Sequence, residues 1–143
     1  NYPQRMLTSL RGMQLAAACE PDFSLWRNAP RAEQVWAVYR TRWVSRLWQR
    51  AGIPIIPSLN WSDAESYKWA WLGIPRVVEV AAVECRSCGR HRTEFNAGLA
   101  AACETVKPKR LIVYGDQNDW VIIPLGVSPI WVQPPTNKRT RGE

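Results

Sequence analysis

The stretch VVEVAAVECRSCGRHRTEFNAGLAAACETVKPKRLIVYG, residues 77–115, decides the fold. It begins with a short apolar and β-branched run at 77–83 and ends with another at 111–114, and such runs are typical of buried strands. Between the two runs, residues 94–106 carry apolar side chains at helical spacing, and Pro108 ends that pattern. A strand, a helix and a strand joined by short links predict parallel strands with a right-handed crossover.

The same alternation extends along the rest of the chain. We predict helices over 4–19, 28–50 and 62–72, a strand over 53–59, and a strand or an extended link over 22–26. Residues 121–123 and 130–132 are candidates for further strands. Gly52 follows the second helix as a C-terminal stop, and Ser62 with Glu65 forms the S-x-x-E pattern of a capping box. A closed eight-fold (β/α) barrel takes about 250 residues. We therefore predict an α/β domain whose mostly parallel sheet is open or forms a partial (β/α) barrel, with flanking helices.

Length and charge limit the class of protein. The 143 residues predict a single α/β domain over 1–133, followed by a basic, disordered tail over 134–143. The net charge of +7 predicts attraction to polyanions. No apolar run reaches the roughly 18 residues of a membrane span, and no signal peptide is visible. We expect a cytoplasmic protein without membrane association, and the sequence leaves its oligomeric state open.

A set of short motifs follows one order along the chain. They are PDFS at 21–24, YRxRW at 39–43, WQ at 48–49, GI at 52–53, IP at 56–57, Trp61, GI at 73–74 and YG at 114–115. In this order they resemble the family named domain of unknown function forty-four seventeen, whose members are encoded by bacteria, plasmids and phages. The resemblance covers residues 22–115. It implies an α/β fold and an origin in a mobile element, and it implies no activity.

Polar residues fall near the ends of the predicted strands. In parallel α/β sheets, ligands bind beyond the carboxyl ends of the strands, so Asp22, Asn60 and Asp63 are our candidate catalytic residues. Carboxylates grouped at this edge can hold Mg²⁺, which prefers oxygen ligands, or act as an acid–base pair. The structural alternative for Asp63 is a place in the first turn of a helix, where a carboxylate is favoured.

Arg40 is the candidate buried charge. Steps of 100° per residue place Arg40 inside the apolar sector of helix 28–50 that is formed by Trp36, Trp43 and Leu47. A buried Arg is rare unless it is paired. We predict that Arg40 reaches Asp22, Glu79 or an anionic ligand. The alternative is that its side chain passes the Trp rings to reach solvent.

Basic side chains gather in three segments. One group lies on the flank of the long helix, one lies in the loop before helix 94–106, and one lies in the tail. The members are Arg42, Arg46 and Arg50; Arg86, Arg90 and Arg92; and Lys138, Arg139 and Arg141. Basic side chains beside Trp rings suit the backbone and bases of nucleic acid. We therefore predict that these residues bind nucleic acid; a solvated helix face is the alternative.

The cysteines offer a candidate metal site. Cys85 and Cys88 form a C-x-x-C with His91 three residues on, which resembles half of a zinc knuckle, and Cys103 on the next helix is the candidate fourth ligand. A chain of this length folds without metal, so free thiols, or a redox or disulfide pair, are the alternatives to zinc. No other cofactor is predicted.

Three hypotheses for function follow. The leading one is a phage or mobile-element protein associated with nucleic acid through a basic Arg and Trp surface. The first alternative is a metal-dependent enzyme that acts on a phosphate-containing substrate, which predicts a concave pocket where Asp22 and Arg40 converge. The second is a phage factor that binds a host protein, which predicts an exposed apolar patch. The sequence does not decide whether the chain is an enzyme.

Overall fold

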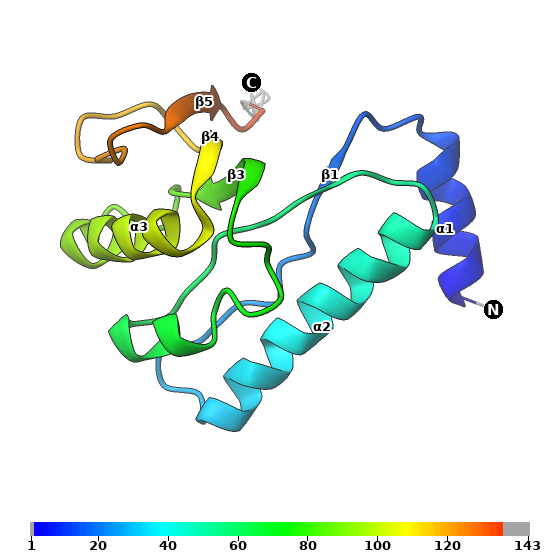
Figure 1. The fold of residues 1–143 in the computed structure, drawn as a ribbon, viewed down its shortest axis with the longest axis horizontal. Coiled ribbons are helices and arrows are strands. Elements are labelled where there is room, and N and C mark those ends of the chain that lie inside the picture. Colours follow the sequence, from blue (N-terminus) through cyan, green and yellow to red (C-terminus); the bar gives the residue numbers. More distant parts are fainter. Residues whose placement is uncertain (1, 136–143) are drawn as a thin grey trace, which may run out of the picture.

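The computed structural model describes residues 2–135 of the chain (Figure 1). Parallel strands alternate with helices, as the sequence predicts. In chain order the elements are α1 (Tyr2–Gly12), β1 (Ala18–Cys19), α2 (Arg31–Arg50), β2 (Ile55–Ile56), the 3-10 helix η1 (Ala64–Lys68), β3 (Val78–Glu84), α3 (Arg92–Val106), β4 (Pro108–Tyr114) and β5 (Ser128–Val132).

The strands follow one another in space in the order of the chain. β1 pairs with β2 in one parallel sheet, and β3, β4 and β5 form a second parallel sheet in that order. A single parallel bridge between Ser58 and Ala82 joins the two sheets. At that bridge the Leu59 amide donates to the Ala82 carbonyl at 2.7 Å. The predicted α/β architecture with open parallel sheets is confirmed.

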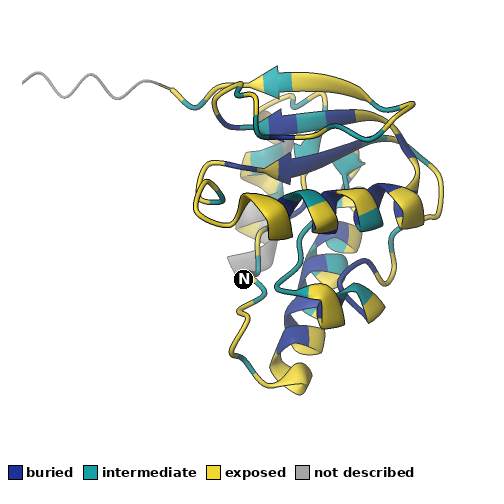
Figure 2. Ribbon diagram, turned by 90° about the vertical axis from the view of Figure 1, so that its left-hand side faces the viewer, coloured by how far each residue is buried: buried dark blue, intermediate teal, exposed yellow. Residues whose placement is uncertain are grey.

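The hydrophobic core lies between α3 and one face of the three-stranded sheet. Leu99 and Val106 of α3 are fully buried against Leu111 and Val113 of β4. In Figure 2 the buried residues lie on the strands and on the inner sides of the helices. The opposite face of the same strands carries Ala82, Glu84, Ile112 and Tyr114, and these residues line a cavity.

Helix α2 buries small residues rather than its Trp rings, so the predicted phase of this helix is wrong. Its buried residues include Ala37, Thr41 and Ser45, whereas Trp36 and Trp43 are more than half exposed. Each buried hydroxyl donates to the carbonyl four residues earlier, with Thr41 bound to Ala37 at 3.1 Å and Ser45 to Thr41 at 2.7 Å. Small side chains allow the helix to approach its packing neighbours, β2 among them, more closely than Trp rings would allow.

The N-terminal elements also differ from the prediction. The first helix ends at Gly12, and the left-handed φ of 48° at Gln14 turns the chain away from the helix. Ala18 and Cys19, predicted to end that helix, instead form β1. The Ala18 amide donates to the carbonyl of Pro54 at 2.9 Å. Pro54 thus takes part in the pairing of β1 with β2 through its carbonyl, and its missing amide hydrogen removes no hydrogen bond from this pairing.

Residues 22–26, predicted to be a strand or an extended link, and the candidate strand 121–123 are both without regular secondary structure. Side chains rather than a ladder hold the second of them. The Asn96 amide nitrogen donates to the Trp120 carbonyl at 2.7 Å, and the Ile122 amide donates to the Asn96 side chain at 2.9 Å. The predicted strand at 130–132 is confirmed as part of β5.

The capping box begins one residue later than predicted. Asp63, rather than Ser62, is the N-cap, and its carboxylate accepts from the Ser66 amide at 3.0 Å. The Asp63 amide in turn donates to the Ser66 hydroxyl at 3.2 Å. The helix it opens is a short 3-10 turn that ends at Lys68 rather than near Leu72.

Of the predicted tail, residues 136–143 lie outside the part of the chain that the structure describes. Lys138, Arg139 and Arg141 belong to that segment. Among the helices of residues 2–135, none combines the length and the apolar composition needed to cross a membrane.

Candidate functional site

A cavity of about 1000 Å³ lies at the carboxyl ends of the parallel strands. Each strand region contributes to its lining. The contributors include Asp22 and Ser24 after β1, Asn60 and Trp61 after β2, Glu84 at the end of β3, and Tyr114 at the end of β4. This is the position at which open α/β sheets bind ligands.

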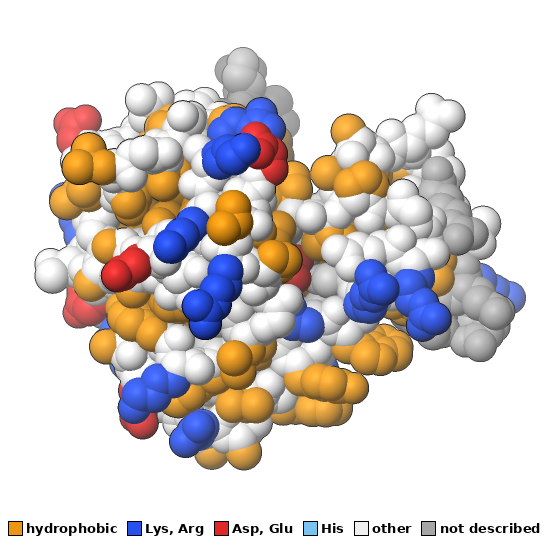
Figure 3. Space-filling model, in the orientation of Figure 1, with side chains coloured by type: hydrophobic (Ala, Val, Ile, Leu, Met, Phe, Trp, Pro, Cys, Tyr) orange, Lys and Arg blue, Asp and Glu red, His pale blue; other side chains and the backbone are white. Residues whose placement is uncertain are grey.

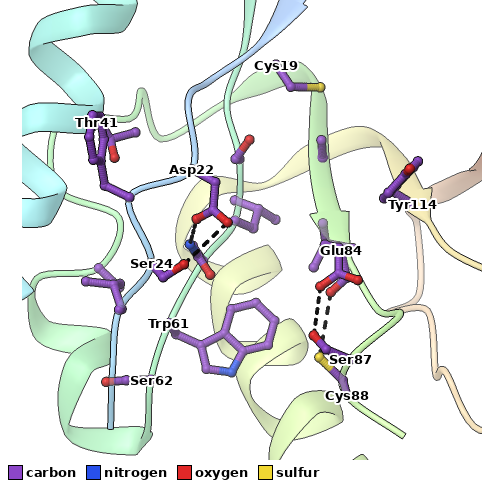
Figure 4. A pocket seen from close by; sticks show the side chains of 18 of the residues that line it. Cys19, Asp22, Ser24, Thr41, Trp61, Ser62, Glu84, Ser87, Cys88 and Tyr114 are labelled. Atoms are coloured by element: carbon purple, nitrogen blue, oxygen red, sulfur yellow. Dashed lines mark hydrogen bonds between the residues drawn. The ribbon is translucent and has the colours of Figure 1, made fainter. Parts of the chain in front are cut away.

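The predicted residues Asp22 and Asn60 meet on one wall of this cavity. The Asn60 amide nitrogen donates to one carboxylate oxygen of Asp22 at 3.0 Å, and the Ser24 hydroxyl approaches the other at 3.5 Å (Figure 4). Within residues 2–135, Asp22 forms no ion pair. The third predicted residue, Asp63, does not line the cavity, because its carboxylate is the N-cap of η1.

Glu84 carries a second carboxylate on the cavity lining, separate from the Asp22 group (Figure 4). The Ser87 hydroxyl donates to the Glu84 carboxylate at 3.0 Å, and the Cys88 thiol lies 3.8 Å from the Glu84 carbonyl. Glu84 is not among the candidate catalytic residues, although its position after a predicted strand places it at the same edge of the sheet. The signal for it was strand alternation, which places it on the same face as Ala82.

Trp61 forms a fixed aromatic wall of the cavity. Its ring contacts Phe95 at a centroid distance of 5.5 Å and Trp71 at 6.4 Å. The ring also lies directly on Gly98, where an added Cβ atom would stand 2.1 Å from the indole nitrogen. Packing on three sides fixes the orientation of Trp61 and leaves its remaining surface toward the cavity.

Arg42 is engaged in contacts within the fold, and its predicted binding of nucleic acid stays a prediction. Its guanidinium pairs with Glu20, and it donates to the carbonyls of Leu72 at 2.9 Å and Ala70 at 3.3 Å. The Glu20 carboxylate also accepts from the Ser58 amide at 3.0 Å. The side chain of Glu20 is only 5% exposed. Burial of the carboxylate explains why the guanidinium turns inward rather than toward solvent.

Arg40 is half-buried and unpaired with the predicted carboxylates. Its guanidinium carbon lies 4.5 Å from the ring centre of Phe23 and 6.0 Å from that of Trp36. Glu79 pairs instead with Lys109 at 2.9 Å. Of the predicted partners, neither Asp22 nor Glu79 pairs with Arg40, and its guanidinium lies against the two rings; binding of an anionic ligand stays a prediction. Arg40 and Asp22 nevertheless line a second cavity of about 210 Å³.

The predicted zinc set is not assembled. Across the described residues, no group of three or more His, Cys, Asp or Glu side chains stands ready to hold a metal ion. Cys85, Cys88 and Cys103 are free thiols, as is Cys19. Burial raises the pKa of Cys103 to about 11. Burial first, and then the carboxylate of Glu84, raise the pKa of Cys85. These shifts disfavour the thiolate that binds a metal.

Helix α2 carries an exposed aromatic and basic surface, which we call the α2 outer face. It comprises Trp36, Tyr39, Trp43, Arg46 and Arg50, which recur on one side of the helix. The rings of Trp36 and Tyr39 stack at a centroid distance of 5.3 Å with 16° between their planes. Figure 3 shows hydrophobic side chains gathered along the edge of the molecule over α2, with basic side chains beyond them toward its C-terminal end.

The loop arginines lie elsewhere, between β3 and the first turn of α3. Arg86, Arg90 and Arg92 are exposed. The guanidinium of Arg86 lies 5.6 Å from the ring centre of Tyr114, which lines the large cavity. Arg92 lies 5.7 Å from the ring centre of Trp120, and its Nε donates to the Gly89 carbonyl at 3.0 Å.

Two phage proteins are similar to this chain. Each is named "Gene 1 protein", one from Mycobacterium phage L5 and one from Mycobacterium phage D29, and each is 36% identical over 115 residues. The match covers 79% of this chain, but only 49% of the L5 protein and 42% of the D29 protein. The chain therefore spans about half the length of these relatives. They support the phage origin that the sequence predicts.

No solved structure matches the chain. The model of the family DUF4417, a domain of unknown function, matches residues 1–125, as the resemblance in the motifs predicts. The chain belongs to the DUF4417 family.

Proposed function

We propose that this chain is a phage protein that binds single-stranded nucleic acid through the α2 outer face. One observation carries the proposal. Trp36, Tyr39 and Trp43 are 54%, 54% and 56% exposed on one face of a well-formed helix, and the exposed Arg46 and Arg50 continue the same line.

Exposed rings suit unpaired bases. Stacking of a base on an aromatic side chain is worth about 1–3 kcal/mol and tolerates any base, because every base has a π-face. From Trp36 to Arg50 the helix rises about 21 Å, at about 1.5 Å per residue. This length presents rings at one end and two guanidinium groups at the other, so one strand can stack its bases and neutralise its phosphates along a single helix.

The loop arginines supply a second contact region in this proposal. Arg86 lies over Tyr114 at the cavity. Arg90 in the same loop and Arg92 at the start of α3 are exposed. Guanidinium groups bind phosphate oxygens through two parallel hydrogen bonds, so these residues fit a phosphate backbone. They carry no sequence information by themselves, which agrees with stacking that does not depend on the base.

Replacement of the rings tests the proposal. Trp36→Ala with Trp43→Ala removes two stacking surfaces, so binding of a fluorescent single-stranded oligonucleotide should weaken by at least about 30-fold. The matched control is Leu125→Ala, which removes a fully exposed apolar side chain outside α2. Equal affinity of the double variant and the control would overturn the proposal. The alternative, in which the α2 outer face binds a host protein, would then account for the exposed rings.

A second candidate function is an enzyme that acts on a phosphate-containing substrate. The observation in its favour is that Asp22 and Arg40 both line the cavity of about 210 Å³. The buried Nε of Arg40 has no hydrogen-bond partner within residues 2–135. Hydrolysis of an aryl phosphodiester in the presence of Mg²⁺, lost in Asp22→Asn, would support this candidate, and no turnover with any divalent cation would remove it.

A further inference from the structure

The large cavity combines an aromatic wall with hydrogen-bond acceptors. Trp61 is fixed by Gly98, Phe95 and Trp71, so it offers an immobile flat surface. Asp22 and Glu84 carry their carboxylates on the same lining (Figure 4). A volume of about 1000 Å³ is enough for a nucleoside, since small-molecule sites take about 300–1000 Å³.

The charge of the lining opposes phosphate. Asp22, Glu84 and Glu94 line the cavity in a protein whose net charge is +7. Of the two described arginines on the lining, Arg42 is already committed to Glu20, so Arg27, with His91 also on the lining, stands against three carboxylates. Binding in this cavity therefore favours a ligand that carries hydrogen-bond donors over a ligand that carries negative charge.

The orientation of Asn60 adds a further acceptor. A carboxylate only accepts hydrogen bonds, so the contact with Asp22 at 3.0 Å fixes the amide nitrogen of Asn60 toward Asp22. The carbonyl oxygen of Asn60 is left as an acceptor on its other side. Each carboxylate has about four lone-pair sites, and among the described residues Asp22 accepts from two donors, Asn60 and Ser24. The group can thus accept from an amino group that carries two hydrogens.

We propose that this cavity binds a nucleobase that carries an exocyclic amino group, with its ring against Trp61 and its amino group on Asp22 and Asn60. Cytosine, adenine and guanine have such an amino group, and uracil and hypoxanthine lack it. The base can belong to a free nucleoside or to an unpaired residue of a strand. The inference concerns a site separate from the α2 outer face and does not rest on it.

Calorimetric titration of the chain with nucleosides tests the inference through two matched pairs. Cytidine should bind at least about tenfold more tightly than uridine, and guanosine more tightly than inosine, because hydrogen bonds to a charged acceptor are the strong ones. Asp22→Asn should remove the preference for cytidine. Glu84→Gln is a second variant of the lining, and Glu104→Gln, an exposed acid on α3, is the control. Thermal unfolding of each variant shows that it is folded.

Oligonucleotides distinguish the two sources of the base. If a base of the strand enters the cavity, a cytosine oligomer should bind more tightly than a thymine oligomer, and Asp22→Asn should abolish that difference. If only free nucleosides enter, the difference appears with nucleosides alone. Equal binding of cytidine and uridine, or no nucleoside binding at millimolar concentration, would overturn the inference. Neither result affects stacking on α2, which the ring variants test separately.

Discussion

Arg42 and Glu20 form an ion pair that joins the middle of α2 to the end of β1. The Glu20 carboxylate also receives the Ser58 amide, and the guanidinium also reaches the Leu72 carbonyl. This pair therefore connects segments around β1, β2, η1 and α2 beside the large cavity.

Removal of Arg42 should destabilise the fold. Arg42→Ala leaves the Glu20 carboxylate buried without its partner, and broken buried pairs cost about 3–5 kcal/mol. Urea denaturation should show this loss, whereas the exposed Arg46→Ala should stay within about 0.5 kcal/mol of the parent chain. A stable Arg42→Ala that loses nucleic-acid binding would mean that the guanidinium belongs to the binding surface after all.

A single methyl group at position 98 should displace Trp61. In Gly98→Ala the new Cβ would stand 2.1 Å from the indole nitrogen, so the ring must move. We expect a loss of about 1–3 kcal/mol, typical of overpacking, together with loss of nucleoside binding. Gly89→Ala is the matched control, because a Cβ there meets nothing within 4 Å. Unchanged stability and binding in Gly98→Ala would contradict the fixed position of Trp61.

Alkaline pH should weaken the fold through Cys103. Burial raises the pKa of this thiol from its usual 9.0 to about 11. The unfolded chain releases the proton first, so stability is complete below pH 9.0 and falls as pH rises toward about 11. The slope reaches about 1.4 kcal/mol per pH unit. Urea denaturation at several pH values measures this slope. In Cys103→Ala the free energy of unfolding should change less with pH in this range. An identical slope in that variant would refute the assignment of the slope to Cys103.

The two exposed arginines at the end of α2 should set part of the salt dependence. Each phosphate contact on single strands contributes about 0.7 to the slope of log affinity against log salt. Arg46→Ala with Arg50→Ala should therefore lower that slope by about 1.4. Arg76→Ala, which removes an exposed charge outside α2, is the control. If the double variant keeps the salt slope of the parent chain, the phosphates do not contact Arg46 and Arg50.

The sequence was sufficient for the β3–α3–β4 unit because its two apolar runs and the helix between them need no other information. The sequence was not sufficient to predict which side of α2 is buried. Periodicity identifies an apolar sector but not what covers it, and here small residues such as Ala37 and Ser45 are buried while Trp36 and Trp43 face solvent. Polar residues can be buried on a helix when their hydroxyls bond to its own carbonyls.

The part of the candidate site that follows from the order of the parallel strands could be predicted from the sequence. Asp22 and Asn60 meet because both follow neighbouring parallel strands. Glu20 was not predictable, since β1 has only two residues and its pattern is too short to recognise. The predicted zinc set is not assembled for a related reason: Cys85 and Cys103 are both buried in the hydrophobic core, whereas the His91 side chain is exposed.

Binding of single-stranded nucleic acid is the central claim, and fluorescence anisotropy of the chain with matched single- and double-stranded DNA and RNA tests it most directly. We expect single strands to bind more tightly than duplexes of the same sequence. Between about 50 and 200 mM salt, two phosphate contacts alone should weaken binding by about sevenfold. No binding of any strand at about 50 mM salt, despite the charge of +7, would contradict the account.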